Sequence, residues 1–207
     1  MKIISNTAIT LDGRISPERT RHRRFGSQTD VRMMSVIRKK ADAVLLGGNS
    51  FRHWPYPVTS SKKTIYNVVV TARFDLPVTR EFRTDKRIIP LILTTKKRIP
   101  KNFPLEVLQC RGRITPAWIV RQLAARGVKT LLLEGGGDLI HQFVRDGFLN
   151  RMYVTLCPKL IGRKGAPTLC DGAGFKNPEI KGLSLVRTLR CGDEIFLEYD
   201  LPGTKQR

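Results

Sequence analysis

Short apolar runs alternate with amphipathic stretches along most of the chain. The runs have the length of β-strands, are rich in β-branched or aliphatic residues, and end at glycine or polar residues. Strands are predicted in this way at Ile3–Thr10, Ala43–Leu46, Ile65–Thr71, Ile88–Thr94, Lys129–Leu133 and Met152–Leu156. Two later runs, Leu183–Leu189 and Ile195–Tyr199, flank a turn at Cys191-Gly192-Asp193 and predict an antiparallel hairpin.

Three stretches between the predicted strands indicate helices, because each begins at a capping residue or at glycine and ends at a charged residue or glycine. The predicted helices cover Ser27–Lys40, Thr115–Gly127 and Gly135–Gly147. This alternation predicts one α/β domain with a mostly parallel central sheet, helices on both faces and the antiparallel hairpin at its C-terminal end. We expect the domain to cover residues 1–201, followed by a flexible tail over residues 202–207.

The composition is that of a globular protein. With 207 residues, of which 41% are apolar, the chain can bury a substantial core, and this excludes a disordered tail. The apolar runs are far too short to span a bilayer. The N-terminus starts directly with a strand-like pattern and carries no secretory signal, so we expect a cytoplasmic location.

The four cysteines lie far apart, and no pair has the close spacing of a zinc site. They are Cys110, Cys157, Cys170 and Cys191. Disulfides are not expected in a chain without a secretory signal. We therefore predict buried free thiols and no metal site.

The net charge of +21 makes polyanions the expected partners. Nucleic acid is one such class and is kept as a competing hypothesis. The basic residues are spread over the whole chain, and the one dense cluster, Arg19–Arg24, is interpreted as a solvated loop. Phosphorylated small molecules fit the charge equally well, and we favour them over nucleic acid.

The most informative local motif is an apolar strand, Leu131–Leu133, that runs through Glu134 into three glycines and a helix. Backbone without Cβ atoms lets a ligand approach closely, and the free N–H groups of a helix start attract anions. A pyrophosphate site is therefore predicted, although a tight turn without a ligand is the structural alternative. Glu134 lies where α/β sheets place ligands, and it either accepts hydrogen bonds from an amino-bearing ring, caps the helix, or pairs with a basic residue.

Two further strand ends carry candidate binding residues. Thr71-Ala72-Arg73 ends a strand with a hydroxyl and a guanidinium, which together suit a ribose 2′-phosphate, although a surface arginine is the simpler interpretation. Gly47-Gly48-Asn49-Ser50 is a second glycine-containing strand end. Neither a hydrolase triad motif nor the zinc-deaminase signature occurs in the chain.

Taken in order, the motifs resemble those of the riboflavin-pathway pyrimidine reductases, most closely the stand-alone archaeal and fungal type. The similarity extends from about Lys2 to Tyr199. It includes the opening strand with its Leu-Asp-Gly-Arg turn, the first helix with the second strand, the Glu-Gly-Gly-Gly motif, the Pro-Lys-x-x-Gly motif and the Ala-Pro-Thr motif. These segments are Ile4–Ile15, Ile37–Leu45, Leu133–Leu139, Cys157–Gly162 and Ala166–Phe175.

The resemblance implies a dihydrofolate-reductase-like fold, a homodimer, and NADPH as the hydride donor. The implied substrate is a diaminopyrimidinone bearing a ribosylamino 5′-phosphate, which is reduced to the ribityl form. In substrate binding, Glu134 is implied to contact the pyrimidine and Arg38 the phosphate, and Asn6 lies where the first strand meets nicotinamide and substrate. Asp12 and Glu134 are the implied catalytic residues, although Asp12 serves equally well as a turn residue.

The cofactor site implied by the resemblance combines the two glycine-containing strand ends with the strand end at Thr71-Ala72-Arg73. Its residues are Gly47, Ser50, Thr71, Arg73, Gly135, Gly136, Gly137, Asp138 and Leu139. The chain departs from the family at Phe51–Pro57, where an acidic motif with proline is usual, and we interpret this segment as a loop on the substrate side. It departs again at Leu149-Asn150-Arg151, which we relate to packing or to the dimer. Because of the first departure, a pterin or dihydrofolate remains the alternative substrate.

Overall fold

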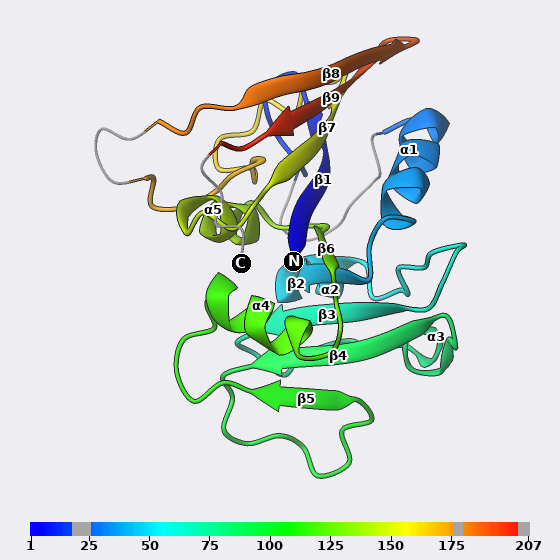
Figure 1. The fold of residues 1–207 in the computed structure, drawn as a ribbon, viewed down its shortest axis with the longest axis vertical. Coiled ribbons are helices and arrows are strands. Elements are labelled where there is room, and N and C mark those ends of the chain that lie inside the picture. The colour runs from blue at the N-terminus through cyan, green and yellow to red at the C-terminus, as the bar shows by residue number, and fades with distance from the viewer. Residues whose placement is uncertain (18–25, 176–179, 203–207) are drawn as a thin grey trace.

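The fold was analysed in a computed structural model, which describes residues 1–17, 26–175 and 180–202. Within this part of the chain, nine strands form one twisted sheet in the order β5-β4-β3-β2-β6-β1-β7-β9-β8 (Figure 1). The strands from β5 to β7 are parallel, and β9 and β8 continue the sheet antiparallel. Their bounds are β1 Lys2–Thr10, β2 Ala43–Gly47, β3 Ile65–Thr71, β4 Ile88–Thr94, β5 Glu106–Gln109, β6 Thr130–Leu133, β7 Arg151–Cys157, β8 Ser184–Cys191 and β9 Glu194–Asp200.

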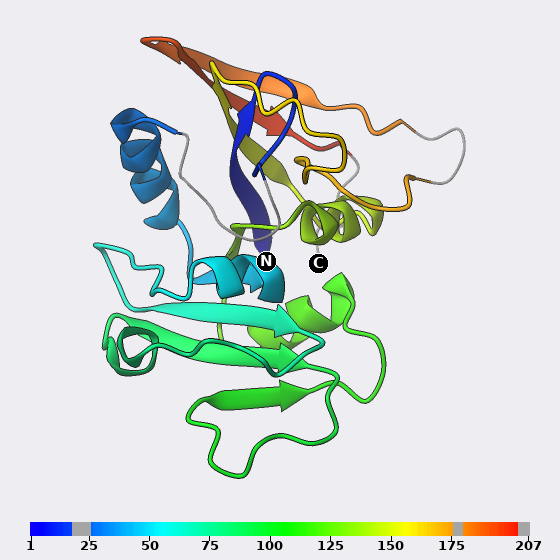
Figure 2. The ribbon, with the colours of Figure 1, turned by 180° about the vertical axis from the view of Figure 1, so that it is seen from behind.

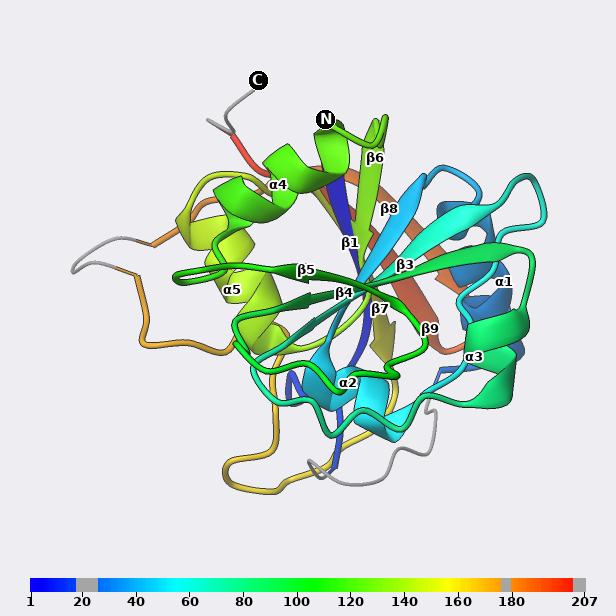
Figure 3. The same ribbon diagram turned by 90° about the horizontal axis from the view of Figure 1, so that it is seen from below.

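Five helices of the described residues cover the two faces of this sheet. They are α1 Gln28–Arg38, α2 Gly48–His53, α3 Arg80–Thr84, α4 Pro116–Ala124 and α5 Gly137–Arg145. Apolar side chains of α4 and α5 pack in one core cluster, and those of α1, α2 and α3 pack in the other. Figure 3 views the sheet along its edge, with α4 and α5 on one side and α1 and α3 on the other. The predicted α/β fold with helices on both faces and a C-terminal hairpin is therefore confirmed.

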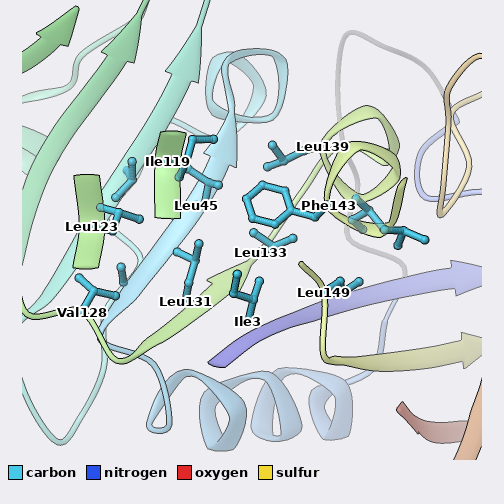
Figure 4. Close-up of a cluster of buried hydrophobic side chains, with 14 of the residues drawn as sticks. Ile3, Leu45, Ile119, Leu123, Val128, Leu131, Leu133, Leu139, Phe143 and Leu149 are labelled. Carbon is cyan, nitrogen blue, oxygen red and sulfur yellow. The ribbon is translucent and has the colours of Figure 1, made fainter. Parts of the chain in front are cut away.

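The larger core cluster fixes α5 against the middle of the sheet. Phe143 of α5 is fully buried and points toward Leu45 of β2 and Leu133 of β6 (Figure 4). Burial of such a side chain contributes roughly 1.5–3 kcal/mol. Ile119 and Leu123 of α4 cover the neighbouring part of the same face. This packing holds the start of α5 directly beyond the carboxyl end of β6.

The register of the parallel strands brings the candidate site residues to one edge of the sheet. Ser5 of β1 pairs with Leu133 of β6, so Asn6 lies beside Glu134. Gly47 of β2 pairs with Val70 of β3, so the Gly48 that opens α2 lies beside Thr71. The carboxyl ends of parallel strands are where open α/β sheets bind ligands.

Three short elements were not predicted: β5, α2 and α3. Strand β5 has four residues at the edge of the sheet, and its two end residues are exposed. Helix α2 begins with glycine, and α3 buries a single apolar side chain, Phe82. Elements this short carry too few apolar positions to produce a recognisable period. The stretch Trp54–Lys63, whose two prolines and consecutive Thr/Ser positions predict a loop, contains no helix or strand, as the view from behind also shows (Figure 2).

All four cysteines lie in the described part of the chain and are free thiols. Cys110 and Cys157 are buried as predicted, whereas Cys170 and Cys191 are exposed, so the prediction was wrong for these two. Burial and the nearby Glu194 carboxylate raise the pKa of the Cys157 thiol to about 12. Cys191 lies on β8, whose eight residues are all exposed, and this position at the sheet edge keeps its thiol accessible.

The helices of the described residues are short or polar, and none of them meets the length and apolarity of a membrane span. Among the same residues, no cluster of three histidine, cysteine or acidic side chains forms a metal site. The basic cluster Arg19–Arg24 and the tail from residue 203 onward lie outside the described residues. The predictions made for them, a solvated loop and a flexible tail, therefore stay predictions.

Candidate functional site

Two adjoining hollows open at the carboxyl edge of the sheet. The first, called here the glycine hollow, has a volume of about 430 Å³ and is lined by residues that include Gly47, Ser50, Thr71, Arg73 and Gly136. The second, called here the carboxylate hollow, has a volume of about 300 Å³ and is lined by residues that include Asn6, Asp30, Arg38, Trp54 and Glu134. Ser50 and Gly136 line both, so a single elongated ligand or two ligands in contact can occupy the pair.

Part of the wall of the glycine hollow is glycine backbone without side chains. A Cβ atom added to Gly47 would meet no atom within 4 Å, and one added to Gly136 would meet only Ser50 Oγ, at 3.8 Å. Gly136 also adopts a φ of +69°, a conformation that favours glycine. Bare backbone beside the uncapped start of α5 forms a cradle for an anionic ligand that side chains would otherwise fill.

The three consecutive glycines each have a structural reason of their own. Gly135 and Gly136 have positive φ values of +139° and +69°. A Cβ on Gly137 would lie 2.4 Å from the carbonyl oxygen of Thr168, so this glycine is required by packing against the segment that carries the Ala-Pro-Thr motif. The conformation and packing of the chain thus account for all three glycines without a ligand. The feature that indicates a ligand is the hollow beside them.

The predicted cofactor residues divide between the two hollows. Seven of them line the glycine hollow together, as expected for one shared site: Gly47, Ser50, Thr71, Arg73, Gly136, Asp138 and Leu139. Gly135 lines the carboxylate hollow instead, and Gly137 is not among the residues that line either one. Asp138 is exposed in the first turn of α5, where a carboxylate stabilises the helix dipole.

An arginine that the sequence analysis placed on the substrate side lies on the glycine hollow. Arg52 belongs to α2, and its Nη2 donates to Thr71 Oγ1 at 3.2 Å while its Nη1 donates to Asn49 Oδ1 at 3.0 Å. It also pairs with Asp75, which follows β3. The interpretation of the Phe51–Pro57 segment as a substrate loop is thus wrong for Arg52, because the short helix α2 turns this side chain toward β3.

The carboxylate hollow is built around a buried ion pair. Arg38 Nε donates to Glu134 Oε1 at 2.7 Å, and Arg38 Nη2 donates to Glu134 Oε2 at 2.6 Å. The two side chains are only 18% and 10% exposed. Burial disfavours the charged guanidinium, but the Glu134 carboxylate more than offsets this and raises the pKa of Arg38.

This pairing bears on the roles implied by the resemblance. Arg38 and Glu134 were predicted to contact opposite ends of the substrate, and the structure joins their side chains by two hydrogen bonds. The predicted substrate contacts of the two residues stay predictions. The geometry fits a carboxylate that receives the ligand and an arginine that orients that carboxylate.

The carboxylate hollow also contains residues that the sequence analysis did not single out. Thr7 lines it, and Thr7 Oγ1 is buried without a hydrogen-bond partner among the described residues. Asp30, at the start of α1, is a buried carboxylate on the same hollow. Trp54 also lines it. A buried polar atom left unpaired is costly, so Thr7 indicates a position where a polar ligand is received.

Asp12 holds a turn and does not line either hollow. Its carboxylate accepts hydrogen bonds from Thr10 Oγ1 at 2.5 Å, from Gly162 N at 2.8 Å and from Ile161 N at 3.2 Å. The hydrogen bond from Thr10, followed by that from Gly162, lowers the pKa of Asp12 to about 2. The three hydrogen bonds tie the carboxylate to the end of β1 and to the backbone of Ile161 and Gly162. Of the two interpretations of Asp12, the structure supports the turn.

Sequence comparison identifies relatives over almost the whole chain. The family model described as the RibD C-terminal domain matches residues 1–197. The 2,5-diamino-6-ribosylamino-4(3H)-pyrimidinone 5′-phosphate reductase of Methanothermobacter thermautotrophicus is 24% identical over 219 aligned positions, which cover 97% of this chain and 98% of the relative.

Structure comparison gives the same fold. A deaminase/5-amino-6-(5-phosphoribosylamino)uracil reductase from Thermotoga maritima superimposes with a TM-score of 0.80 at 17% identity, covering 97% of this chain. This chain spans 56% of the Thermotoga protein's length. Dihydrofolate reductase from Enterococcus faecalis, solved with NADP(H), has a TM-score of 0.58 at 13% identity, covering 97% of this chain and 96% of that one. Because the family model matches residues 1–197 of this chain, the chain belongs to the RibD C-terminal domain family.

Proposed function

We propose that the protein is an NADPH-dependent reductase of riboflavin biosynthesis that converts 2,5-diamino-6-ribosylamino-4(3H)-pyrimidinone 5′-phosphate to its ribitylamino form. The reductase activity and the pathway follow from the family and from the relatives that carry this name. One structural observation carries the proposal. The glycine hollow, which is lined by glycines and two arginines, adjoins the carboxylate hollow at Ser50 and Gly136, and the carboxylate hollow contains Glu134.

The residues of the glycine hollow fit a phosphorylated dinucleotide. Gly47 and Gly136 leave room for it, the start of α5 suits its pyrophosphate, and Arg73 suits a 2′-phosphate. When bound, NADPH supplies the hydride that reduces C1′ of the ring-opened sugar. The shared wall at Ser50 and Gly136 brings donor and acceptor together, which is the main contribution expected of the protein.

Glu134 is the proposed receptor for the pyrimidine. A carboxylate accepts hydrogen bonds from exocyclic amino and ring N–H groups, and the two hydrogen bonds from Arg38 fix the direction of the Glu134 carboxylate. Asn6 and Thr7 offer further polar contacts on the same wall. Trp54 and Met34 complete it with apolar surface that excludes water from the reacting atoms.

The choice of substrate is tested by following NADPH oxidation with two acceptors. The proposal expects turnover with the diaminopyrimidinone ribosylamino 5′-phosphate and none with dihydrofolate. Turnover of dihydrofolate alone would assign the protein to the alternative substrate class. Because the net charge of +21 keeps nucleic acid as the other alternative, RNA binding is measured at moderate salt, where binding by charge alone falls steeply.

We also infer that the protein is a cytoplasmic homodimer. Strand β8 lies at the end of the sheet with all its residues exposed, including Leu185, Val186 and Leu189. An exposed apolar edge strand promotes association, and a second copy of the chain would cover it. Sedimentation is expected to give a dimer for the wild type and a monomer for the double variant Leu185→Glu/Leu189→Glu. A monomeric wild type would contradict the inference.

Replacing Arg73 by alanine is expected to weaken NADPH binding about tenfold, or about 1.4 kcal/mol. The reason is that the 2′-phosphate loses a charge-assisted partner, whereas NADH has no such group and should bind almost unchanged. Fluorescence titration with each nucleotide measures both constants. The control is Arg83→Ala, because Arg83 is an exposed arginine of α3 and is not among the residues lining the hollow. Equal weakening of NADPH and NADH would remove Arg73 from the 2′-phosphate site.

A further inference from the structure

We propose that Arg52 is the second 2′-phosphate-binding arginine of the glycine hollow and that Asp75 is a built-in competitor for the same position. This inference rests on the proposed binding of NADPH in that hollow. It assigns a specificity role to two residues that neither the sequence motifs nor the family resemblance indicated.

Arg52 is the better ordered of the two arginines at the hollow. Its side chain is 17% exposed, against 66% for Arg73. It donates to Asn49 Oδ1 and Thr71 Oγ1, and at 3.4 Å to the backbone carbonyl of Arg73. A guanidinium held in this way loses little further freedom when it binds an anion, so it is a stronger anion receptor than the exposed Arg73.

Asp75 marks the position that an anion takes between the two arginines. Arg52 donates to Asp75 Oδ1 through Nε at 3.0 Å and also through Nη2, and Arg73 Nε lies 3.9 Å from Asp75 Oδ2. A phosphate is bound by arginine with the same parallel N–H donors as a carboxylate. The carboxylate of Asp75 therefore occupies, within the chain itself, the place that a 2′-phosphate requires.

Asp75 can leave this place, because its side chain is 57% exposed. The hydrogen bond from Arg52 lowers the pKa of Asp75, so the carboxylate stays ionised and competes with the phosphate as one anion against another. NADH carries no 2′-phosphate and is not subject to this competition. Removal of the Asp75 charge should therefore favour NADPH alone, and removal of the Arg52 charge should disfavour NADPH alone.

The experiment uses the full chain and two nucleotide fragments, adenosine 2′,5′-bisphosphate and adenosine 5′-monophosphate, with dissociation constants measured by calorimetry. For the fragment with the 2′-phosphate, Asp75→Asn should bind about fivefold more tightly than wild type and Arg52→Leu about thirtyfold more weakly. The fragment without it should change less than twofold in both variants, on the order of 0.4 kcal/mol. The matched control is Asp85→Asn, which removes one carboxylate from another exposed arginine pair, that of Arg87, and should alter neither constant.

The outcomes separate this inference from the proposed function. If Asp75→Asn binds the 2′-phosphate fragment no more tightly than the wild type does, Asp75 is not a competitor. This conclusion holds even when the wild type turns over substrate with NADPH. If Arg52→Leu weakens both fragments equally, Arg52 is a general structural residue and the assignment is overturned. If the fragments behave as expected while no pyrimidine substrate is reduced, the phosphate site stands and the proposed function fails.

Discussion

Replacing Glu134 by glutamine is expected to lower turnover about 100-fold, equivalent to about 2.7 kcal/mol of transition-state stabilisation. The carboxylate accepts two hydrogen bonds from Arg38 and, in the proposed reaction, further ones from the pyrimidine. The amide offers one acceptor and places its NH₂ group against N–H donors. Arg38 is then left with an incomplete partner in a largely buried position, which costs on the order of 1–3 kcal/mol of stability.

The measurement compares turnover, NADPH affinity and thermal unfolding for wild type and Glu134→Gln. Turnover should fall while NADPH affinity stays within about twofold, because Glu134 lies in the carboxylate hollow and not in the glycine hollow. Glu106→Gln is the control, since Glu106 pairs with Arg126 at the exposed edge of the sheet. Full activity in Glu134→Gln would exclude this carboxylate from the reaction.

Placing tryptophan at Gly136 is expected to abolish detectable NADPH binding, with a loss of at least about 100-fold in affinity. The glycine belongs to both hollows, and space is open around the position where its Cβ would lie. An indole ring would fill that space. It would also disfavour the positive φ of residue 136, which costs roughly 1–2 kcal/mol in stability.

A matched variant separates the two effects of this substitution. Gly127 has a φ of +78°, is exposed, and has no atom within 4 Å of an added Cβ. It follows α4 and is not among the residues that line the glycine hollow. Gly127→Trp should therefore lose similar stability but keep NADPH affinity. Loss of binding in both variants, or in neither, would contradict the assignment of the glycine hollow to the cofactor.

Much of the fold could be predicted because the long strands carry their own signal. The β-branched runs of β3 and β4 match their predicted ranges in full, and the hairpin strands β8 and β9 differ from theirs only at the ends. The glycine-containing strand ends were predicted to share a site, and parallel strand ends indeed bring Gly47, Thr71 and Gly136 to one hollow. Local pattern and the geometry of parallel sheets are sufficient for this level of description.

The contacts that could not be predicted are those between residues far apart in the sequence. Arg38 and Glu134 are 96 positions apart, so nothing local to either residue indicates that they bind each other. Arg52 could not be placed because α2 is six residues long and starts with glycine, which hides the helix from periodicity analysis. Gly137 looked like a ligand-binding residue until the loop that packs against it, through Thr168, was placed in space.

The central claim is that a nicotinamide in the glycine hollow reduces a pyrimidine held in the carboxylate hollow. It is tested most directly by incubating the protein with the diaminopyrimidinone ribosylamino 5′-phosphate and NADPH that carries deuterium at both C4 positions. The product should be the ribitylamino phosphate with a single deuterium at C1′. A product without deuterium, or no reduction of this substrate at all, would contradict the account.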